Sequence, residues 1–526
     1  MARPTSSIPR LRLAASATAI LAALALAAAL PARAEASPSQ FSIMQDDNQL
    51  VYGTDAQRER ALTIMKALGV DTVRVTVLWS FVAPKQALDD DGASNPDAYP
   101  RGRISRFDKL VDSAQRRGID VQFNVTGPGP RWTQATSKDK ALQRGYKPDT
   151  RAYGFFVEAL ARRYSGGYED RDGGRLPRVS SWSFWNEPNF PSWITPQSEP
   201  SRRLNGKLVP VAPAIYRELA VAGAKALLRT GHSGDLVSIG ETAPLGSDAS
   251  GPKRSLRPTQ FARELFCLDG ALRPYRGEAA KARRCDRVRK LKVLGALPRL
   301  AWGHHPYTQR LSPNSPNGER GSITLANINA LPKLLDRIAL ARPGTLRAGV
   351  PILLTEFGYE TEPDPFAGIS LAKQTGYINE GDYTAFRNPR IAAVTQFQLD
   401  DVPPDEANPV GSRRYWRTYQ SGLYDLDGHP KPSAGAYAFP FAMSRVGDQV
   451  EFWGQLRFLP NGTQTNVQIQ IKTGSEFANF GPPLPVTNAN GFFATRAAVP
   501  GGTVWRAVWV APNGEDVAYS RQTTVP

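Results

Sequence analysis

Two short motifs each place a glutamate where an apolar, β-branched run ends. Glu187 lies in SFWNEPN, residues 183–189, and Glu356 lies in LLTEFGY, residues 353–359. Two carboxylates that face each other across a cleft can cleave a glycosidic bond, one as a protonated acid and the other as an ionised nucleophile. The motifs therefore predict glycosidic chemistry, and the alternative is a pair of surface glutamates at strand ends.

The runs that carry these glutamates belong to a longer alternation of strands and helices between residues 41 and 440. Segments with helical spacing of apolar residues lie between short apolar runs, and continuous apolar runs are typical of parallel strands buried on both faces. The helical segments include 57–68, 104–117, 151–164 and 214–228, and the strands are predicted at 41–45, 72–78, 120–125, 179–185, 236–240, 300–303, 352–356 and 392–399.

Eight strands that alternate with helices predict an α/β fold, a (β/α)8 TIM barrel with long loops. A doubly wound open sheet is the alternative. That fold would need a glycine-rich turn after the first strand, where Asp46, Asp47 and Asn48 stand instead. In a barrel the active site lies at the carboxyl ends of the strands. Because Glu187 ends the fourth strand and Glu356 the seventh, both are expected at the mouth.

On these motifs, residues 41–440 resemble the clan A retaining glycoside hydrolases, a superfamily of (β/α)8 enzymes that includes glycoside hydrolase families 5 and 39. In that clan an Asn-Glu pair ends strand four. The resemblance implies that Glu187 is the acid/base, that Asn186 holds the sugar 2-hydroxyl, and that Glu356 is the nucleophile.

The resemblance to family 5 extends to the surroundings of the nucleophile. Arg74 matches an arginine of strand two, and His305 and Tyr307 match a His-x-Tyr motif of strand six. An arginine and a tyrosine hydroxyl near the nucleophile would keep it ionised and correctly rotated. The alternatives are a structural ion pair for Arg74 and a hydrogen-bonded structural role for His305. Strand three carries Asn124 where family 5 has a histidine, and strand eight, 395–401, lacks a tryptophan.

Four tryptophans just beyond strand ends are candidates for a sugar-binding cleft, because flat indole rings stack on the apolar faces of pyranoses. They are Trp79, Trp132, Trp193 and Trp416. We expect two or three of them to touch substrate, and the alternative for each is an ordinary core position. Glu241, just after strand five, is expected to be a hydrogen-bonded loop carboxylate or a substrate contact. No cofactor and no metal site are expected.

After residue 440 the pattern changes to runs that alternate apolar and polar residues between Gly, Asn and Pro turns. Such runs are typical of antiparallel strands. They lie at 449–458, 465–472, 491–498, 503–510 and 517–523. They predict a small all-β sandwich domain over 445–526.

Residues 1–34 have the pattern of a secretory signal peptide. Arginines precede an Ala/Leu-rich run, and Ala32-Arg33-Ala34 is a small-x-small cleavage motif. The alternative is a membrane anchor, since the run at 13–30 is nearly long enough to span a bilayer. We expect cleavage near Ala34 and a secreted, extracellular protein without stable membrane insertion.

The composition adds expectations about bonding and partners. Two cysteines in an oxidising compartment favour a disulfide between Cys267 and Cys285. The formal net charge is +17, dispersed along the chain apart from a cluster between Lys281 and Lys292. No nucleic-acid-binding motif accompanies this charge, so nucleic acid is not expected as a partner. We expect a monomer that acts on an oligo- or polysaccharide.

Taken together, these features predict a secreted retaining glycoside hydrolase that cleaves a β-linked glycan by double displacement. Two alternatives are open. A transglycosylase would use the same residues with another acceptor, and a non-catalytic glycan-binding or wall-associated protein could be built on a degenerate barrel.

Overall fold

The computed structural model describes residues 37–171 and 173–525. The predicted signal peptide, 1–34, lies outside this part of the chain. Within the described residues, no helix is both long and apolar enough to cross a membrane.

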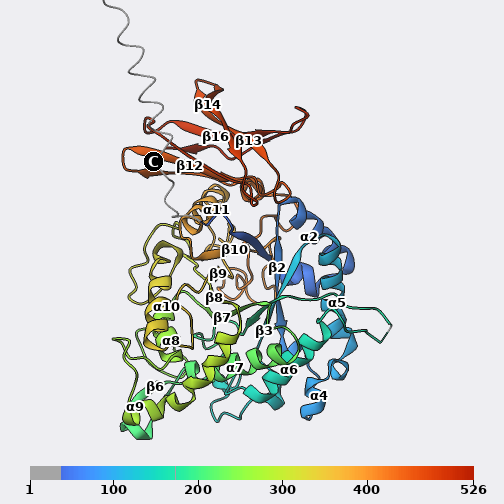
Figure 1. Ribbon diagram of the computed structural model, residues 1–526, viewed down its shortest axis with the longest axis vertical. Coiled ribbons are helices and arrows are strands. Elements are labelled where there is room, and N and C mark those ends of the chain that lie inside the picture. The colour runs from blue at the N-terminus through green and yellow to red at the C-terminus, as the bar shows by residue number, and fades with distance from the viewer. Residues whose placement is uncertain (1–36, 172, 526) are drawn as a thin grey trace, which may run out of the picture.

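Eight parallel strands form a closed barrel in the larger part of the molecule (Figure 1). They are β1 (Phe41–Gln45), β2 (Thr72–Leu78), β3 (Asp120–Thr126), β4 (Ser181–Phe184), β7 (Leu236–Thr242), β8 (Arg299–His304), β9 (Ile352–Leu354) and β10 (Ile391–Phe397). The strands follow one another around the ring, and β1 pairs with both β2 and β10. The predicted (β/α)8 barrel is confirmed, and the open-sheet alternative is wrong.

The barrel strands are covered on both faces, so their apolar and polar side chains alike are mostly buried. In β2, Val73, Val75 and Val77 are completely buried. Successive side chains of a strand point to opposite faces, so Arg74, between two of these valines, points into the barrel. The burial of the valines thus fixes the direction of the one charged side chain of the strand.

Helices surround the barrel, and local capping sets where they begin. Thr54 and Gln57 form a reciprocal capping box at the first of them, and Asp149 accepts backbone hydrogen bonds at the third. The long helices are α2 (Asp55–Ala67), α5 (Arg101–Arg116), α6 (Thr150–Arg163), α7 (Ala212–Arg229), α10 (Ala330–Ala341) and α11 (Leu371–Phe386). The four segments predicted as helical correspond to α2, α5, α6 and α7.

Shorter elements lie in the loops. The helices are α3 (Trp79–Val82), α4 (Asp90–Ser94), α8 (Pro258–Leu265), α9 (Gly277–Ala282), α12 (Pro432–Ala438) and the 3-10 helix η6 (Cys285–Ala296), and a hairpin joins β5 (Ser198–Pro200) to β6 (Leu208–Pro210). Single helical turns are η1 (Asn48–Tyr52), η2 (Pro96–Ala98), η3 (Arg131–Thr133), η4 (Lys140–Leu142), η5 (Arg202–Leu204) and η7 (Leu325–Asn327). The disulfide between Cys267 and Cys285 is present, as predicted. It links the end of α8 to the start of η6.

The C-terminal part consists of two antiparallel sheets that enclose an apolar core, which confirms the predicted sandwich. One sheet contains β11 (Phe441–Val446), β12 (Gln449–Gln455) and β15 (Phe492–Ala497). The other contains β13 (Thr465–Thr473), β14 (Glu476–Val486), β16 (Val504–Val510), β17 (Val517–Tyr519) and β18 (Thr523–Thr524). The sequence did not predict β11 and β14, whose residues lack a regular apolar–polar alternation.

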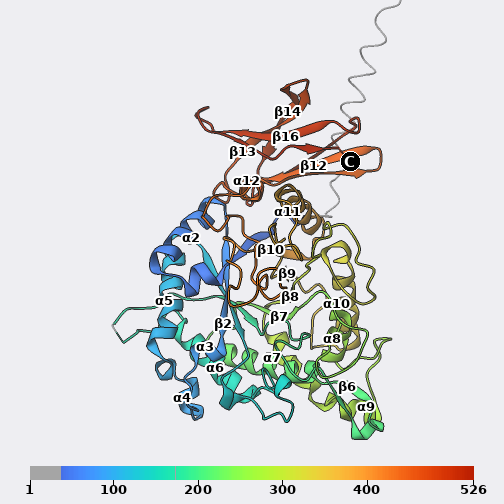
Figure 2. The same ribbon diagram turned by 180° about the vertical axis from the view of Figure 1, so that it is seen from behind.

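The sandwich packs against α11 at one end of the barrel (Figures 1 and 2). Tyr383 and Phe386 of this helix form an apolar cluster with Trp453 and Phe492 of the sandwich. A sandwich loop reaches the amino-terminal ends of the strands, where Asn461 Nδ2 donates to Asp71 Oδ1 at 2.8 Å. The carboxyl-terminal mouth of the barrel therefore lies on the side away from this contact.

Candidate active site

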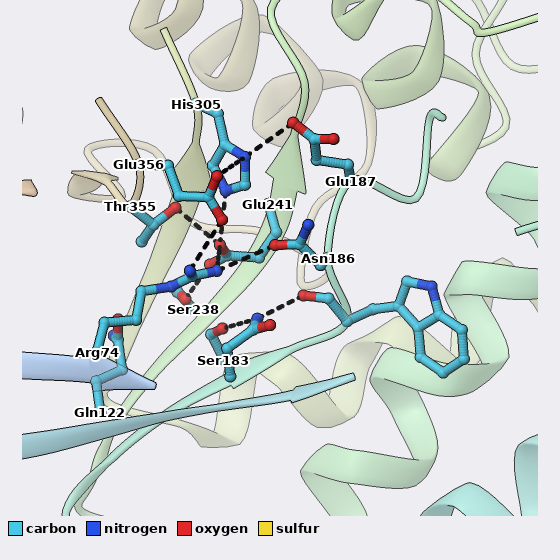
Figure 3. Close-up of polar contacts among 12 residues, drawn as sticks. Arg74, Gln122, Ser183, Asn186, Glu187, Ser238, Glu241, His305, Thr355 and Glu356 are labelled. Atoms are coloured by element: carbon cyan, nitrogen blue, oxygen red, sulfur yellow. Dashed lines mark hydrogen bonds and ion pairs between the residues drawn. The ribbon is translucent and has the colours of Figure 1, made fainter. Parts of the chain in front are cut away.

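Glu187 and Glu356 meet at the carboxyl-terminal mouth of the barrel (Figure 3). Both approach the imidazole of His305: Glu187 Oε1 lies 3.1 Å and Glu356 Oε2 lies 3.5 Å from His305 Nδ1. Carboxylate oxygens of the two glutamates lie within 4.8 Å of each other. Their side chains are 20% and 13% exposed. A molecule in the mouth can thus reach both carboxylates at once.

Two donors hold the two oxygens of Glu356. Arg74 Nη1 donates to Oε1 at 3.0 Å, and the hydroxyl of Tyr307 donates to Oε2 at 3.2 Å. Arg74 comes from β2 and also donates to the side chain of Gln45 at the end of β1. The carboxylate is therefore fixed in rotation by groups from opposite parts of the ring.

The backbone after β4 makes a tight turn that carries Glu187. Trp185 and Glu187 have φ angles of 67° and 34°, a left-handed conformation that non-glycine residues rarely adopt. Asn124 of β3 stabilises this turn, since its Nδ2 donates to Ser183 Oγ at 2.6 Å and to Trp185 O at 2.7 Å. Between them Asn186 is buried, and its Oδ1 accepts from Arg74 Nη2 at 3.2 Å. Asn124, in place of a histidine, thus supports the turn that presents the glutamate.

A third carboxylate, Glu241, lies beneath the other two in Figure 3 and is completely buried. Its Oε2 accepts from Arg74 Nη2 at 3.1 Å and from Thr355 Oγ1 at 2.7 Å, and it lies 3.4 Å from His305 Nε2. Its Oε1 accepts from Ser238 Oγ at 2.6 Å. Without exposed surface Glu241 does not touch a substrate, so of the two expectations for this residue the hydrogen-bonded carboxylate fits.

The electrostatics of the site follow from this packing. Burial alone would raise the pKa of Glu241, but the hydrogen bond with His305 and the charges of Arg74 and His305 lower it to about 2. Burial alone would lower the pKa of His305, but the surrounding carboxylates, Glu356 first, raise it to about 9. At neutral pH the site therefore contains two cations, Arg74 and the imidazolium of His305, and an ionised Glu241.

The pKa of Glu356 is raised, whereas that of Glu241 is lowered. Burial raises its pKa, the charges of His305 and Arg74 oppose that rise, and the nearby carboxylates of Glu187 and Glu241 add to it, so that the pKa lies above its usual 4.5. The positive charges of Arg74 and His305 limit this rise. A change in either charge is therefore expected to change the pKa of Glu356.

The four predicted cleft tryptophans do not share one environment. Trp79 is only 1% exposed and stacks on Phe156 with ring centroids 5.7 Å apart. It belongs to the core and offers no free face to a sugar, which corrects the expectation for this residue. Trp132, Trp193 and Trp416 are half-buried, so each keeps accessible ring surface.

Two residues at the site, Gln45 and Tyr419, were not predicted to take part in it, and Glu241 was expected only as a loop carboxylate or a substrate contact. Gln45 ends β1 and Glu241 lies one residue before the end of β7, so the strand-end rule that found the catalytic candidates could have assigned both to the site. Tyr419 lies in the long loop after β10, where no sequence signal marked it. Its ring is 49% exposed and packs edge-on against Phe397, with centroids 5.1 Å apart.

Two groups of side chains among the described residues lie close enough to share a cation. One contains Glu187, His305 and Glu356, where Arg74 and the imidazolium already supply positive charge. The other contains Asp425, Asp427 and His429 in a largely exposed turn. We assign neither as a metal site.

No family model and no curated protein matches this chain. Among solved structures it is similar to a monomeric β-xylosidase from Caulobacter crescentus CB15, with 14% identity and a TM-score of 0.47 over 92% of this chain and 94% of that one. It is also similar to an endo-β-1,4-mannanase from Thermotoga petrophila, with 12% identity and a TM-score of 0.42 over 92% and 97% of the two chains. A GH5_18 protein from Bifidobacterium longum subsp. infantis has 15% identity and a TM-score of 0.44 over 76% and 77%. At this level of similarity, function has to be inferred from the site itself.

Proposed function

We propose that this protein is a secreted retaining glycoside hydrolase that cleaves the O-glycosidic bonds of a β-linked oligo- or polysaccharide. The observation that carries the proposal is the spacing of Glu187 and Glu356, since one carboxylate oxygen of each lies within 4.8 Å of one of the other. Retaining enzymes need two carboxyl groups about 5–5.5 Å apart, whereas inverting enzymes need about 6.5–9.5 Å to admit a water molecule between them. The short spacing supports double displacement.

In the first step Glu356 attacks the anomeric carbon and forms a glycosyl ester, while Glu187 gives its proton to the departing glycosidic oxygen. In the second step Glu187, now ionised, takes a proton from a water molecule. The oxygen of that water displaces Glu356 from the anomeric carbon, so the original configuration returns. The donors on both oxygens of Glu356 orient it for attack.

We assign Asn186 to the sugar 2-hydroxyl, because it borders both Glu187 and Arg74. Trp132, Trp193 and Trp416 are the remaining candidates for stacking on the sugar. The catalytic domain would span 41–440 and the sandwich 445–526, with 1–34 as the signal peptide. The disulfide supports an oxidising, extracellular compartment. A monomer suffices, since one chain supplies every residue of the site.

Turnover of aryl β-glycosides and β-linked polysaccharides, with proton NMR of the first-formed anomer, tests this proposal. We expect a product of retained configuration. Inverted product would contradict the mechanism. Binding of glycan without turnover would favour the non-catalytic alternative, and transfer to sugar acceptors in place of water would favour a transglycosylase.

Two variants separate the roles of the glutamates. Glu356→Ala is expected to lose turnover on every substrate, because no nucleophile remains. Glu187→Ala is expected to retain far more activity on aryl glycosides with activated leaving groups, which need little protonation, and added azide would give a glycosyl azide of retained configuration. Equal losses on all substrates in both variants would contradict the separate roles.

A further inference from the structure

We propose that Glu241 is a positioning residue, which holds Arg74 and His305 as a charged pair against the two catalytic carboxylates. The inference rests on the function proposed for Glu187 and Glu356. Glu241 contacts both cations and neither catalytic glutamate, so it would act only through them.

The contacts form one connected unit. Arg74 bridges Glu241 and Glu356, at 3.1 Å and 3.0 Å. His305 bridges Glu241, at 3.4 Å from Nε2, and Glu187, at 3.1 Å from Nδ1. Each catalytic carboxylate thus touches a cation whose other side touches Glu241. Removal of this anchor would take one charged partner from each cation, while Arg74 keeps Glu356 and His305 keeps Glu187.

The barrel is built locally to admit this carboxylate. The pairing of β7 with β8 shifts register between Ile239 and Thr242, and Glu241 in this bulge has a left-handed φ of 44°. On β8, Gly303 leaves the necessary space, since a Cβ there would lie 2.0 Å from Glu241 Oε1. A buried charge and a strained backbone are each costly for stability, and both occur at Glu241, beside the space that Gly303 leaves open.

The charges explain what Glu241 adds. Arg74 and His305 carry two positive charges, and Glu241 with ionised Glu356 carries two negative charges. These four charges balance within the buried cluster, in which each cation lies between Glu241 and a catalytic carboxylate. Without Glu241, the two buried cations would face only the ionised carboxylate of Glu356. The imidazolium of His305 would then lose its proton more easily than Arg74.

The charged and titratable groups around these side chains belong to the site, except Asp47, whose charge also acts on Arg74. His305 meets the three glutamates and neighbours His304, Tyr307 and Arg74. Its neighbour His304 is buried between Thr242 and the carbonyl of Ile323, and burial lowers its pKa to about 4. His304 therefore stays neutral when His305 titrates, and a charge change at neutral to alkaline pH belongs to His305.

Glu241→Gln tests the proposal, because glutamine keeps the size and removes the charge. The chain has only four histidines, so NMR of protein labelled with 13C-histidine can follow His305 directly. We expect its titration midpoint to fall by at least one pH unit from about 9. The matched control is Glu264→Gln, another buried glutamate, which is paired with Arg283 outside the site; it is expected to leave His305 unchanged.

Kinetics provide the second measurement. In Glu241→Gln we expect kcat to fall at least tenfold with little change in KM, because orientation is lost and substrate contacts are kept. The alkaline limb of the pH profile is expected to move to lower pH with the titration of His305. The acid limb moves to lower pH as well, because the negative charge of Glu241 raises the pKa of Glu356.

A second variant guards against misfolding. Ser238→Ala removes the hydroxyl that donates to Glu241 Oε1 and keeps the charge, so kcat is expected to fall while the His305 titration stays close to that of the wild type. In Glu241→Gln, an unchanged His305 titration, or an unchanged pH profile of an active enzyme, would overturn the role of Glu241. Wild-type protein inactive on every glycoside would instead overturn the proposed function, and the NMR titration would still decide whether Glu241 holds the imidazolium.

Discussion

The hydroxyl of Tyr307 donates to one oxygen of Glu356, and its removal isolates a single hydrogen bond to the proposed nucleophile. A hydrogen bond to a charged group contributes about 1.5–3 kcal/mol. Tyr307→Phe is therefore expected to lower kcat/KM about tenfold or more. Because the lost bond stabilised the carboxylate, the pKa of Glu356 rises and the acid limb of the kcat/KM profile moves to higher pH.

The control for this variant is Tyr359→Phe, which removes a buried hydroxyl that bonds Thr308 and not Glu356. A similar displacement of the acid limb in both variants would show that the effect does not come from the Glu356 hydrogen bond.

Tyr419 offers a residue-scale prediction about substrate binding. Partial burial and the negative charges of Glu356 and Glu187 raise its pKa, so the exposed ring lies near the catalytic pair. Tyr419→Ala is expected to raise KM several-fold with a smaller effect on kcat, since an aromatic contact contributes about 0.5–1.5 kcal/mol. Tyr419→Phe would keep the wild-type KM, and Tyr519→Ala, an exposed tyrosine on the sandwich, serves as control. An unchanged KM in Tyr419→Ala would remove this residue from the binding site.

At the scale of elements, strand ends were the most predictable feature of the site. Parallel barrel strands are buried on both faces and appear as continuous apolar runs, so the ends of β4 and β9 could be located and their glutamates brought to one mouth. Arg74 followed from the same alternation in β2. These positions depend on local sequence and on the regular geometry of the barrel.

The features of the site that the sequence did not predict depend on contacts between distant segments of the chain. The burial of Trp79 requires Phe156, the place of Glu241 requires a bulge in β7 and a glycine in β8, and the position of Tyr419 requires the fold of a long loop. None of these pairings leaves a periodic pattern in the sequence.

The disulfide gives a prediction for the loop between β7 and β8. This loop contains α8, α9 and η6, so it is more ordered than a long insertion suggests, and Arg217 of α7 donates to the carbonyls of Leu265 and Arg284 on its two sides. Replacement of Cys267 and Cys285 by Ser is expected to cost about 3 kcal/mol through the unfolded chain and to lower Tm by a few degrees. The turnover number should stay within a small factor, because the disulfide packs beside α7. Thiol titration of the unfolded, unreduced protein provides the check: two reactive thiols would contradict the bond.

At the scale of the whole molecule, the sandwich and the mouth lie at opposite ends of the barrel. We therefore expect the sandwich to influence the site through the stability of the barrel that it covers. Its contact with α11 contains an apolar cluster and a buried ion pair, in which Arg457 Nη2 lies 3.0 Å from Asp382 Oδ2.

Arg457→Met tests whether the sandwich contributes to the stability of the barrel and not to catalysis. The substitution leaves the Asp382 carboxylate buried without its partner, and breaking a buried pair costs about 3–5 kcal/mol. We expect a clear fall in Tm with an unchanged kcat/KM at 25 °C, whereas Lys472→Met on the exposed surface of the sandwich changes neither. The additional replacement Asp382→Leu is expected to recover part of the stability, because an apolar pair can substitute for a buried ion pair. A loss of kcat/KM in folded Arg457→Met protein would mean that the sandwich acts on the catalytic mouth through the barrel, and its role as a supporting domain would have to be abandoned.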